Sequence, residues 1–256
     1  MRIDQIAAQL FTVRDLATDA ASLAHTLRRI RNAGYLAVQI SGMPALPEIE
    51  MQALLDDTGL ICCATHEPGD KILRDPQGVA RRLQALRCTE TAYPYPVGVP
   101  LATLEDVRAW VKALDESGRV LREEGITLSY HNHQIEFRRV SGKLILEILY
   151  DETDPMHLQG EIDTYWVQYG GGDPVEWCER LENRLPILHM KDYQITPDNS
   201  PTFAEIGYGN FDWHRIIAAA ENSGCRWFVV EQDICPGDPV DSLAKSFDYI
   251  AQNLLA

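Results

Sequence analysis

The chain has 256 residues, close to the roughly 250 that form a single (β/α)8 barrel, and no Ser/Gly-rich or charge-rich linker divides it. Its 38 acidic and 23 basic residues give a formal net charge of −15, which opposes binding to a phosphate backbone, so we expect no nucleic-acid partner. No apolar run approaches the ~20 residues needed to span a membrane, and the first residues hold no apolar signal core. We therefore expect no membrane partner, a cytoplasmic location, and six reduced cysteines that serve as small core residues.

Apolar runs alternate with amphipathic stretches through the first half of the chain. This order predicts three strand-then-helix units, with strands at 6–11, 36–40 and 59–66 and helices at 18–33, 47–57 and 76–86. A weaker, polar strand is expected at 88–93. It is followed by a long helix over 103–124, which opens on Thr103 and closes at Gly125.

The second half of the chain continues the same alternation. Strands are expected from 126 into the segment around His131, and at 157–163, 186–189 and 226–231. Helices are expected at 144–150, 174–181, 211–223 and 240–255. Eight strand-then-helix units predict parallel strands, and we interpret residues 1–256 as a single (β/α)8 TIM barrel domain.

Polar residues stand at the ends of the predicted strands, where a TIM barrel carries its catalytic groups. His131 and His133 are two residues apart on an extended chain, so their side chains point to the same side. The full set at or just past strand ends is Gln9, His66, His131, His133, Glu136, Asp163, His189 and Glu231. These segments are far apart in sequence, and only a closed barrel brings them together.

Carboxylates that converge at a barrel mouth repel one another, and burying an unpaired carboxylate is costly unless a cation compensates it. A ligand set of carboxylates and imidazoles suits one divalent metal ion of the Mn²⁺, Mg²⁺, Co²⁺ or Zn²⁺ type. The alternative is a purely structural network, because a lone histidine at a strand end is more often hydrogen-bonded than a ligand. Asp163 alone can cap a turn, and Glu231 alone can pair with a lysine.

A metal ion with open coordination positions can bind two oxygens of a hydroxy-carbonyl unit, polarise the carbonyl and stabilise an enediolate. A neighbouring carboxylate or imidazole then moves the proton. Lys191 is a candidate substrate contact. The alternative is a solvated surface lysine, which is the ordinary state of this residue type. Trp166 either offers an apolar face to a sugar ring or fills the core. No GK[ST] sequence follows the glycine clusters, so no nucleotide site is assigned.

Six segments carry a resemblance to a known family. They are residues 9–14, 130–137, 161–167, 188–192, 206–213 and 230–233. In these segments the chain resembles the sugar phosphate isomerase/epimerase family, whose fold is the xylose-isomerase-like TIM barrel.

The resemblance implies one divalent cation held by Glu, Asp, His and Glu side chains from four strands. Asp163, His189 and Glu231 match three of these positions. Many members have a Glu at the end of strand five, where this chain has His131. We expect Glu136, five residues later, as the fourth ligand, with His131 as the alternative.

The same resemblance assigns the remaining roles. His133 is the expected proton-transfer or substrate-contact residue, with His131 and Glu231 as the other catalytic candidates. His66 is similar to a strand-three histidine that faces the substrate in the family, and Gln9 is a further candidate substrate contact.

The first functional hypothesis is a sugar or keto-sugar isomerase/epimerase that abstracts a proton next to a carbonyl. The alternative is a lyase of the inosose-dehydratase or keto-glycoside-cleaving type, because an imidazole at 131 or 133 can protonate a departing oxygen. An endonuclease of this fold is opposed by the net charge, and a non-catalytic sugar-binding protein is the fourth possibility. The expected partner is an unphosphorylated sugar or cyclitol, and a homo-oligomer is left open.

Overall fold

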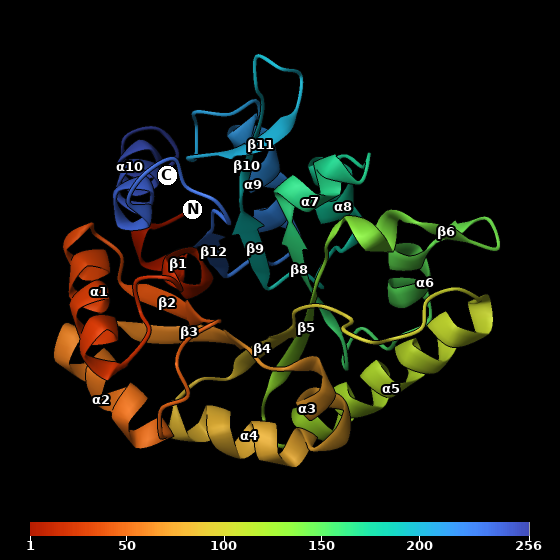
Figure 1. Cartoon of the computed structure of the whole chain (residues 1–256). Helices are drawn as coiled ribbons and strands as arrows, with labels where there is room; N and C mark the ends of the chain where they lie inside the picture. Colours follow the sequence, from red (N-terminus) through yellow and green to blue (C-terminus); the bar gives the residue numbers. More distant parts are fainter. Residues whose placement is uncertain (256) are drawn as a thin grey trace.

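The computed structural model describes residues 1–255 and contains a closed barrel of eight parallel strands in the order β1-β12-β9-β8-β5-β4-β3-β2 (Figure 1). The pairing of β1 with β12, in which Ala7 lies opposite Val229, closes the barrel. The barrel strands are β1 (Ile6–Gln9), β2 (Ala37–Ile40), β3 (Ile61–His66), β4 (Glu90–Tyr93), β5 (Thr127–His131), β8 (Gln159–Asp163), β9 (Ile187–Met190) and β12 (Trp227–Val230). The predicted TIM barrel is therefore confirmed.

Helices surround the barrel (Figure 1), and their buried apolar residues belong to the core that they share with the strands. They are α1 (Ala20–Asn32), α2 (Glu48–Thr58), α3 (Gly69–Arg74), α4 (Pro76–Ala85), α5 (Leu104–Glu123), α6 (Ile145–Asp151), α7 (Thr164–Tyr169), α8 (Pro174–Arg180), α9 (Trp213–Asn222) and α10 (Pro239–Asn253). Helix α5 shows the physical basis of two sequence signals, the residue that begins the helix and its apolar side. The hydroxyl of Thr103 accepts a hydrogen bond from the amide of Asp106, and Val107, Val111 and Leu114 are buried on one side of the helix.

Three elements depart from the predicted pattern. The first strand ends at Gln9 instead of residue 11, because a 3-10 turn over Leu10–Val13 follows and the Gln9 side chain accepts from its second amide. The short helix α7 follows β8 directly and the short helix α3 follows β3 after Glu67 and Pro68; both were missed because they span less than two turns.

Two antiparallel hairpins were also missed. One pairs β6 (Arg139–Val140) with β7 (Lys143–Leu144), and the other pairs β10 (Asp192–Ile195) with β11 (Pro201–Ala204). Their strands are short and partly polar, which gives little period-two signal. The β10–β11 hairpin stands above the barrel, beside α7, at the carboxyl ends of the strands (Figure 1).

The interior of the barrel changes from small apolar residues to polar ones along the strands. An apolar layer is formed by Ala7, Ala37, Cys63, Ala64, Ile187 and Val229. The next residues along these strands that point inward are amides, imidazoles and carboxylates, and all except the half-buried His66 are buried. The larger apolar core lies between strands and helices, so the polar cluster rests on a rigid scaffold.

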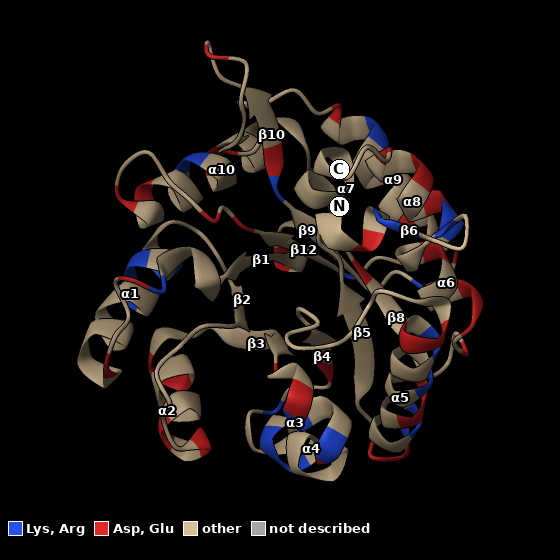
Figure 2. Ribbon diagram, turned by 45° about the vertical axis from the view of Figure 1, so that its right-hand side comes forward, with Lys and Arg blue, Asp and Glu red and all other residues tan. Residues whose placement is uncertain are grey.

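The surface fits the composition of the chain. Lys, Arg, Asp and Glu residues are spread over the outer helices, with both signs on α5 (Figure 2). The six cysteines are all free, and four of them are buried. Within residues 1–255, no helix combines the length and apolar character required to cross a membrane.

Candidate metal centre

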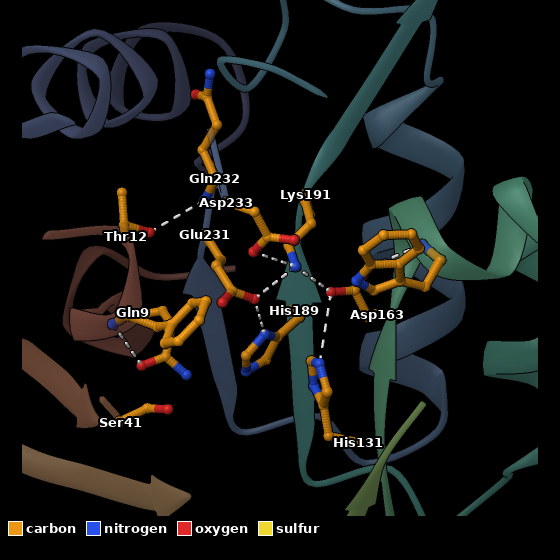
Figure 3. Close-up of polar contacts among 12 residues, drawn as sticks. Gln9, Thr12, Ser41, His131, Asp163, His189, Lys191, Glu231, Gln232 and Asp233 are labelled. Atoms are coloured by element: carbon orange, nitrogen blue, oxygen red, sulfur yellow. Dashed lines mark hydrogen bonds and ion pairs between the residues drawn. The ribbon is translucent and has the colours of Figure 1, made fainter. Parts of the chain in front are cut away.

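Four potential metal ligands meet at the carboxyl ends of β5, β8, β9 and β12. They are His131, Asp163, His189 and Glu231, and all four are buried. The strand register causes the convergence, since Asp163 lies opposite His189, and His189 lies opposite Val229, two residues before Glu231. One donor atom from each of the four residues lies within 4.8 Å of the others. The predicted ligands Asp163, His189 and Glu231 are thus brought together (Figure 3).

A lysine ammonium lies among these carboxylates. The Nζ atom of Lys191 is 2.9 Å from Asp163 Oδ2, 2.9 Å from Glu231 Oε2 and 3.0 Å from Asp233 Oδ1 (Figure 3). Burial acts to lower the pKa of Lys191, but the three carboxylates together raise that pKa well above its usual value. Lys191 is only 1% exposed, so it is an internal counter-ion instead of a solvated surface lysine.

Glu161 forms the floor of the site and was not predicted from the sequence. Its Oε1 atom lies 2.6 Å from His66 Nε2, 3.1 Å from His131 Nδ1 and 3.0 Å from His189 Nε2. Its Oε2 atom accepts a hydrogen bond of 2.7 Å from the Gln39 side-chain amide. One buried carboxylate therefore contacts three imidazoles, and these four residues form a second group with the spacing of metal ligands.

A sequence signal for this floor existed. Glu161 and Asp163 are two residues apart on β8, so both side chains point into the barrel. The same alternation places Gln39 inside β2, where its Oε1 accepts a 3.0 Å hydrogen bond from Gln9 Nε2. Gln9 is fully buried and lies at this lower level, next to Gln39.

The two imidazoles of this group have opposite electrostatic surroundings. Burial lowers the pKa of His189, but Glu161 and Glu231 outweigh it and raise the pKa to about 10, with Glu231 Oε2 at 2.8 Å from Nδ1. Burial and the positive charge at His189 lower the pKa of His131 to about 3. His131 is thus neutral, and its Nδ1 faces Glu161 while its Nε2 lies 3.8 Å from Asp163 Oδ2. A neutral imidazole with one nitrogen held by a carboxylate is the usual form of a metal-bound histidine.

The structure does not bring Glu136 to Asp163, His189 and Glu231. Its carboxylate accepts hydrogen bonds from the Tyr130 hydroxyl at 2.6 Å and from the His133 amide at 2.7 Å. Glu136 lies in the 3-10 turn Gln134–Phe137, and its side chain turns back to cap that turn. The strand-five residue that lies beside the other ligands is His131.

His133 and Trp166 line the rim above the ligand group. Their ring centroids are 5.4 Å apart, and Tyr95 lies edge-on to His133 at 5.0 Å. His133 Nδ1 and Trp166 Nε1 are buried and have no hydrogen-bond partner within residues 1–255. These two ring nitrogens are therefore available to a bound molecule. His66, in contrast, is already held between Glu161 and the Ser41 hydroxyl at 3.3 Å.

The residues present fit a divalent cation. Two carboxylates and two imidazoles form a donor set typical of Mn²⁺, Mg²⁺, Co²⁺ or Zn²⁺. Asp163 Oδ2 has no hydrogen bond of good geometry within residues 1–255, and Lys191 compensates its charge only through an ion pair. An imidazole with an inward nitrogen and an under-coordinated carboxylate oxygen are the groups that a metal ion completes.

An eight-stranded barrel with ionisable residues at the carboxyl ends of four strands is typical of metal-dependent barrel enzymes. The chain belongs to the xylose isomerase-like TIM barrel family, whose model matches residues 27–252.

Individual relatives are distant. The inosose dehydratase of Geobacillus thermodenitrificans (strain NG80-2) is 25% identical over 170 residues, which cover 60% of this chain and 56% of that protein. The chain thus matches little more than half the length of this relative. A sugar phosphate isomerase/epimerase from Parabacteroides distasonis superposes with a TM-score of 0.84 at 22% identity, covering 99% of this chain and 96% of that one. A xylose isomerase-like barrel protein from Mycobacterium smegmatis, in complex with magnesium, superposes with a TM-score of 0.76 at 16% identity over 98% and 97% of the two chains.

Proposed function

We propose that the protein is a divalent-metal-dependent enzyme that removes a proton next to the carbonyl of a sugar, keto-sugar or cyclitol. The observation that carries this proposal is the convergence of His131, Asp163, His189 and Glu231 at one end of the barrel, buried and within ligand spacing. Such a cluster of carboxylates and imidazoles is costly without a cation and well suited to hold one.

The four converging residues would hold the metal ion. Bound there, the ion would polarise a substrate carbonyl and favour the enediolate form. Glu161 fixes the ligand His131 from below through Nδ1 and the ligand His189 through Nε2. The buried floor excludes water from the reacting carbon, which strengthens every charge interaction in the site.

The rim residues would bind the substrate and move its proton. His133 Nδ1 has no hydrogen-bond partner within residues 1–255 and belongs to a ring 4.9 Å from that of His131, so it is suited to accept a proton or a hydroxyl hydrogen bond. Burial lowers the pKa of His133 well below its usual value, so its ring is neutral and acts as an acceptor. Trp166 offers an aromatic face beside it for the apolar side of a sugar ring.

Isomerisation or epimerisation is the first outcome that we propose for this proton abstraction, because the proton then returns to carbon within the same site. Dehydration is the second, and the similarity to an inosose dehydratase specifically favours it. Both outcomes share the metal-supported enediolate and differ in what the enediolate does next. A leaving hydroxyl needs a proton donor, and the cationic Lys191 ammonium is the donor nearest to the ligands.

A single experiment tests the shared step and separates the outcomes. Chelator-treated protein is incubated in D₂O with keto-sugars and inososes, with and without Mn²⁺, Mg²⁺, Co²⁺ or Zn²⁺. Formation of an isomer or epimer without loss of water indicates isomerisation or epimerisation, and deuterium at the carbon next to the carbonyl shows exchange of the abstracted proton with solvent. Loss of water indicates dehydration. Exchange that persists without metal would contradict the proposal.

Two variants connect the activity to the site. Asp163→Ala and His189→Ala should lose bound metal and turnover together, because each removes one of four ligands. Asp57→Asn, at an exposed carboxylate on α2, is the control and should behave as the unmodified protein. Full metal retention in both site variants would overturn the assignment of the ligands.

A further inference from the structure

Lys191 occupies the space between the carboxylates that the proposed metal centre requires. Its ammonium contacts Asp163 and Glu231, which belong to the ligand group, and Asp233, which does not. We infer that Lys191 is the exchangeable counter-ion of this centre: a divalent cation binds by displacing the Lys191 ammonium from Asp163 and Glu231, and the lysine then remains paired with Asp233 at the rim.

The buried carboxylates are better compensated in the exchanged state than in the observed one. In the observed state the Lys191 ammonium is shared by three carboxylates that are 80% or more buried, of which Glu231 also contacts His189. After the exchange a doubly charged cation would face Asp163 and Glu231, and the single charge of Lys191 would face Asp233 alone. Since unpaired buried charge is strongly unfavourable, the second arrangement is the better compensated one.

The surroundings of Lys191 allow its side chain to move while its backbone stays fixed. The Thr164 hydroxyl accepts a hydrogen bond from the Lys191 amide and donates one to its carbonyl oxygen, at 3.1 and 2.9 Å. The Asp233 side chain is 20% exposed, so it lies on the solvent side of the carboxylate group. In the observed position Nζ already lies 5.6 and 5.8 Å from the ring centroids of Trp166 and Phe203, so aromatic rings that attract a cation adjoin the ammonium on this side.

The exchange has a functional consequence. The displaced ammonium would lie beside Trp166 and Asp233, at the rim where a substrate hydroxyl or carbonyl would bind. Metal binding would therefore prepare two features at once, the metal centre and a cationic substrate contact. This inference rests on the proposed metal centre, because it takes Asp163 and Glu231 as ligands, but it does not depend on the identity of the substrate.

The first test measures Mn²⁺ affinity without substrate. Chelator-treated unmodified protein, Lys191→Gln and Lys245→Gln are titrated calorimetrically with MnCl₂ at one pH. Lys245 pairs with Glu205 away from the site and is the matched control. A cation that no longer displaces an ammonium should bind Lys191→Gln at least about tenfold more tightly, while Lys245→Gln matches the unmodified protein. Equal or weaker binding by Lys191→Gln would overturn the inference.

Other outcomes of this titration are also decisive. Mn²⁺ binding by Lys191→Gln alone would overturn the exchange, because Lys191 would then be a permanent substitute for the metal. Unmodified protein that binds Mn²⁺ but converts no keto-sugar or cyclitol would contradict the proposed function and leave the exchange intact. Failure of both proteins to bind any Mn²⁺ would contradict both proposals.

A second test uses only the unmodified protein, so its result does not depend on whether a variant folds. Lysine methylation by formaldehyde and a borohydride reagent is followed by peptide mass spectrometry, with and without Mn²⁺. The buried Lys191 should react slowly in the metal-free protein and several-fold faster with Mn²⁺, because its amine moves toward the rim. Lys245 should react at one rate in both conditions. A Lys191 rate that Mn²⁺ leaves unchanged or lowers would overturn the exchange.

Discussion

The two halves of the barrel present different chemistry to its mouth. The half formed by β5, β8, β9 and β12 ends in ionisable ligands, namely His131, Asp163, His189 and Glu231. The half formed by β1 to β4 contributes mostly neutral groups, among them the buried amides of Gln9 and Gln39, which are joined by a 3.0 Å hydrogen bond. Neutral amides can orient a charged cluster without adding to its charge, so one half can hold a cation and the other can position its ligands.

Glu161 joins the two halves, and its removal should give the largest effect on stability. Its carboxylate contacts Gln39 and His66 on the neutral side and His131 and His189 on the charged side. Glu161→Ala leaves these buried groups without their shared partner, and the free energy of unfolding should fall by about 3–5 kcal/mol. Urea denaturation measures the loss.

The control Glu124→Ala, at an exposed glutamate after α5, should stay within about 0.5 kcal/mol of the unmodified protein. Equal stability of Glu161→Ala would mean that the halves are not coupled through this residue.

The fold was largely predictable because the barrel strands are short apolar runs bounded by helices. Even the polar strand at 88–93 was correctly identified, since Glu90–Tyr93 forms β4. The β10–β11 hairpin was not predictable, because its strands alternate only weakly and its position depends on tertiary contacts. The buried Asp192 carboxylate illustrates these contacts, since it accepts hydrogen bonds from the amide of Gly207 and the indole of Trp213.

The convergence of side chains was predictable where an ionisable residue directly ends a strand. Asp163, His189 and Glu231 follow apolar runs, and parallel strands align their carboxyl ends. Glu161 was not predicted because it lies two positions before Asp163, which ends β8. Both side chains nevertheless point into the interior of the barrel. Glu136 was placed in the ligand set by residue type, but the sequence does not reveal that the turn after β5 uses its carboxylate as a cap.

Two variants test whether the metal ligand near β5 is His131 or Glu136. His131→Ala should weaken Mn²⁺ binding by about 100-fold or more, because it removes a ligand and opens the floor at Glu161. Glu136→Gln should retain Mn²⁺ binding, because this side chain faces Tyr130 and the His133 amide instead. Calorimetric titration of both chelator-treated variants measures the contrast. The reverse result would assign the ligand role to Glu136.

The buried carboxyl group of Glu136, which lies next to the charged half, predicts that the stability of the protein depends on pH. Burial raises its pKa from 4.5 to about 7, although hydrogen bonds from Tyr130 and the His133 amide act to lower it. Between pH 4.5 and about 7 the Glu136 carboxyl group is ionised in the unfolded chain but still protonated in the folded protein. The free energy of unfolding therefore falls as pH rises through this range. The unmodified protein should lose about 2 kcal/mol relative to Glu136→Gln between pH 5 and 7.5. Urea denaturation of both proteins across this range measures the difference. A difference that does not change with pH would show that the carboxyl group ionises normally.

The smallest predicted effect concerns the rims of the two halves, which meet around His133. Trp166 follows β8 on the charged half, and Tyr95 follows β4 on the neutral half, with their rings 5.4 and 5.0 Å from the His133 ring. If Trp166 stacks on the substrate in the ground state and the transition state alike, Trp166→Leu should raise KM by about three- to tenfold and leave kcat unchanged. Tyr95→Leu should change KM less, because Tyr95 is more exposed. Steady-state kinetics on the substrate found in the D₂O screen measures both variants. A fall in kcat with an unchanged KM would instead show that the Trp166 ring acts on the transition state and does not stack on the ground-state substrate.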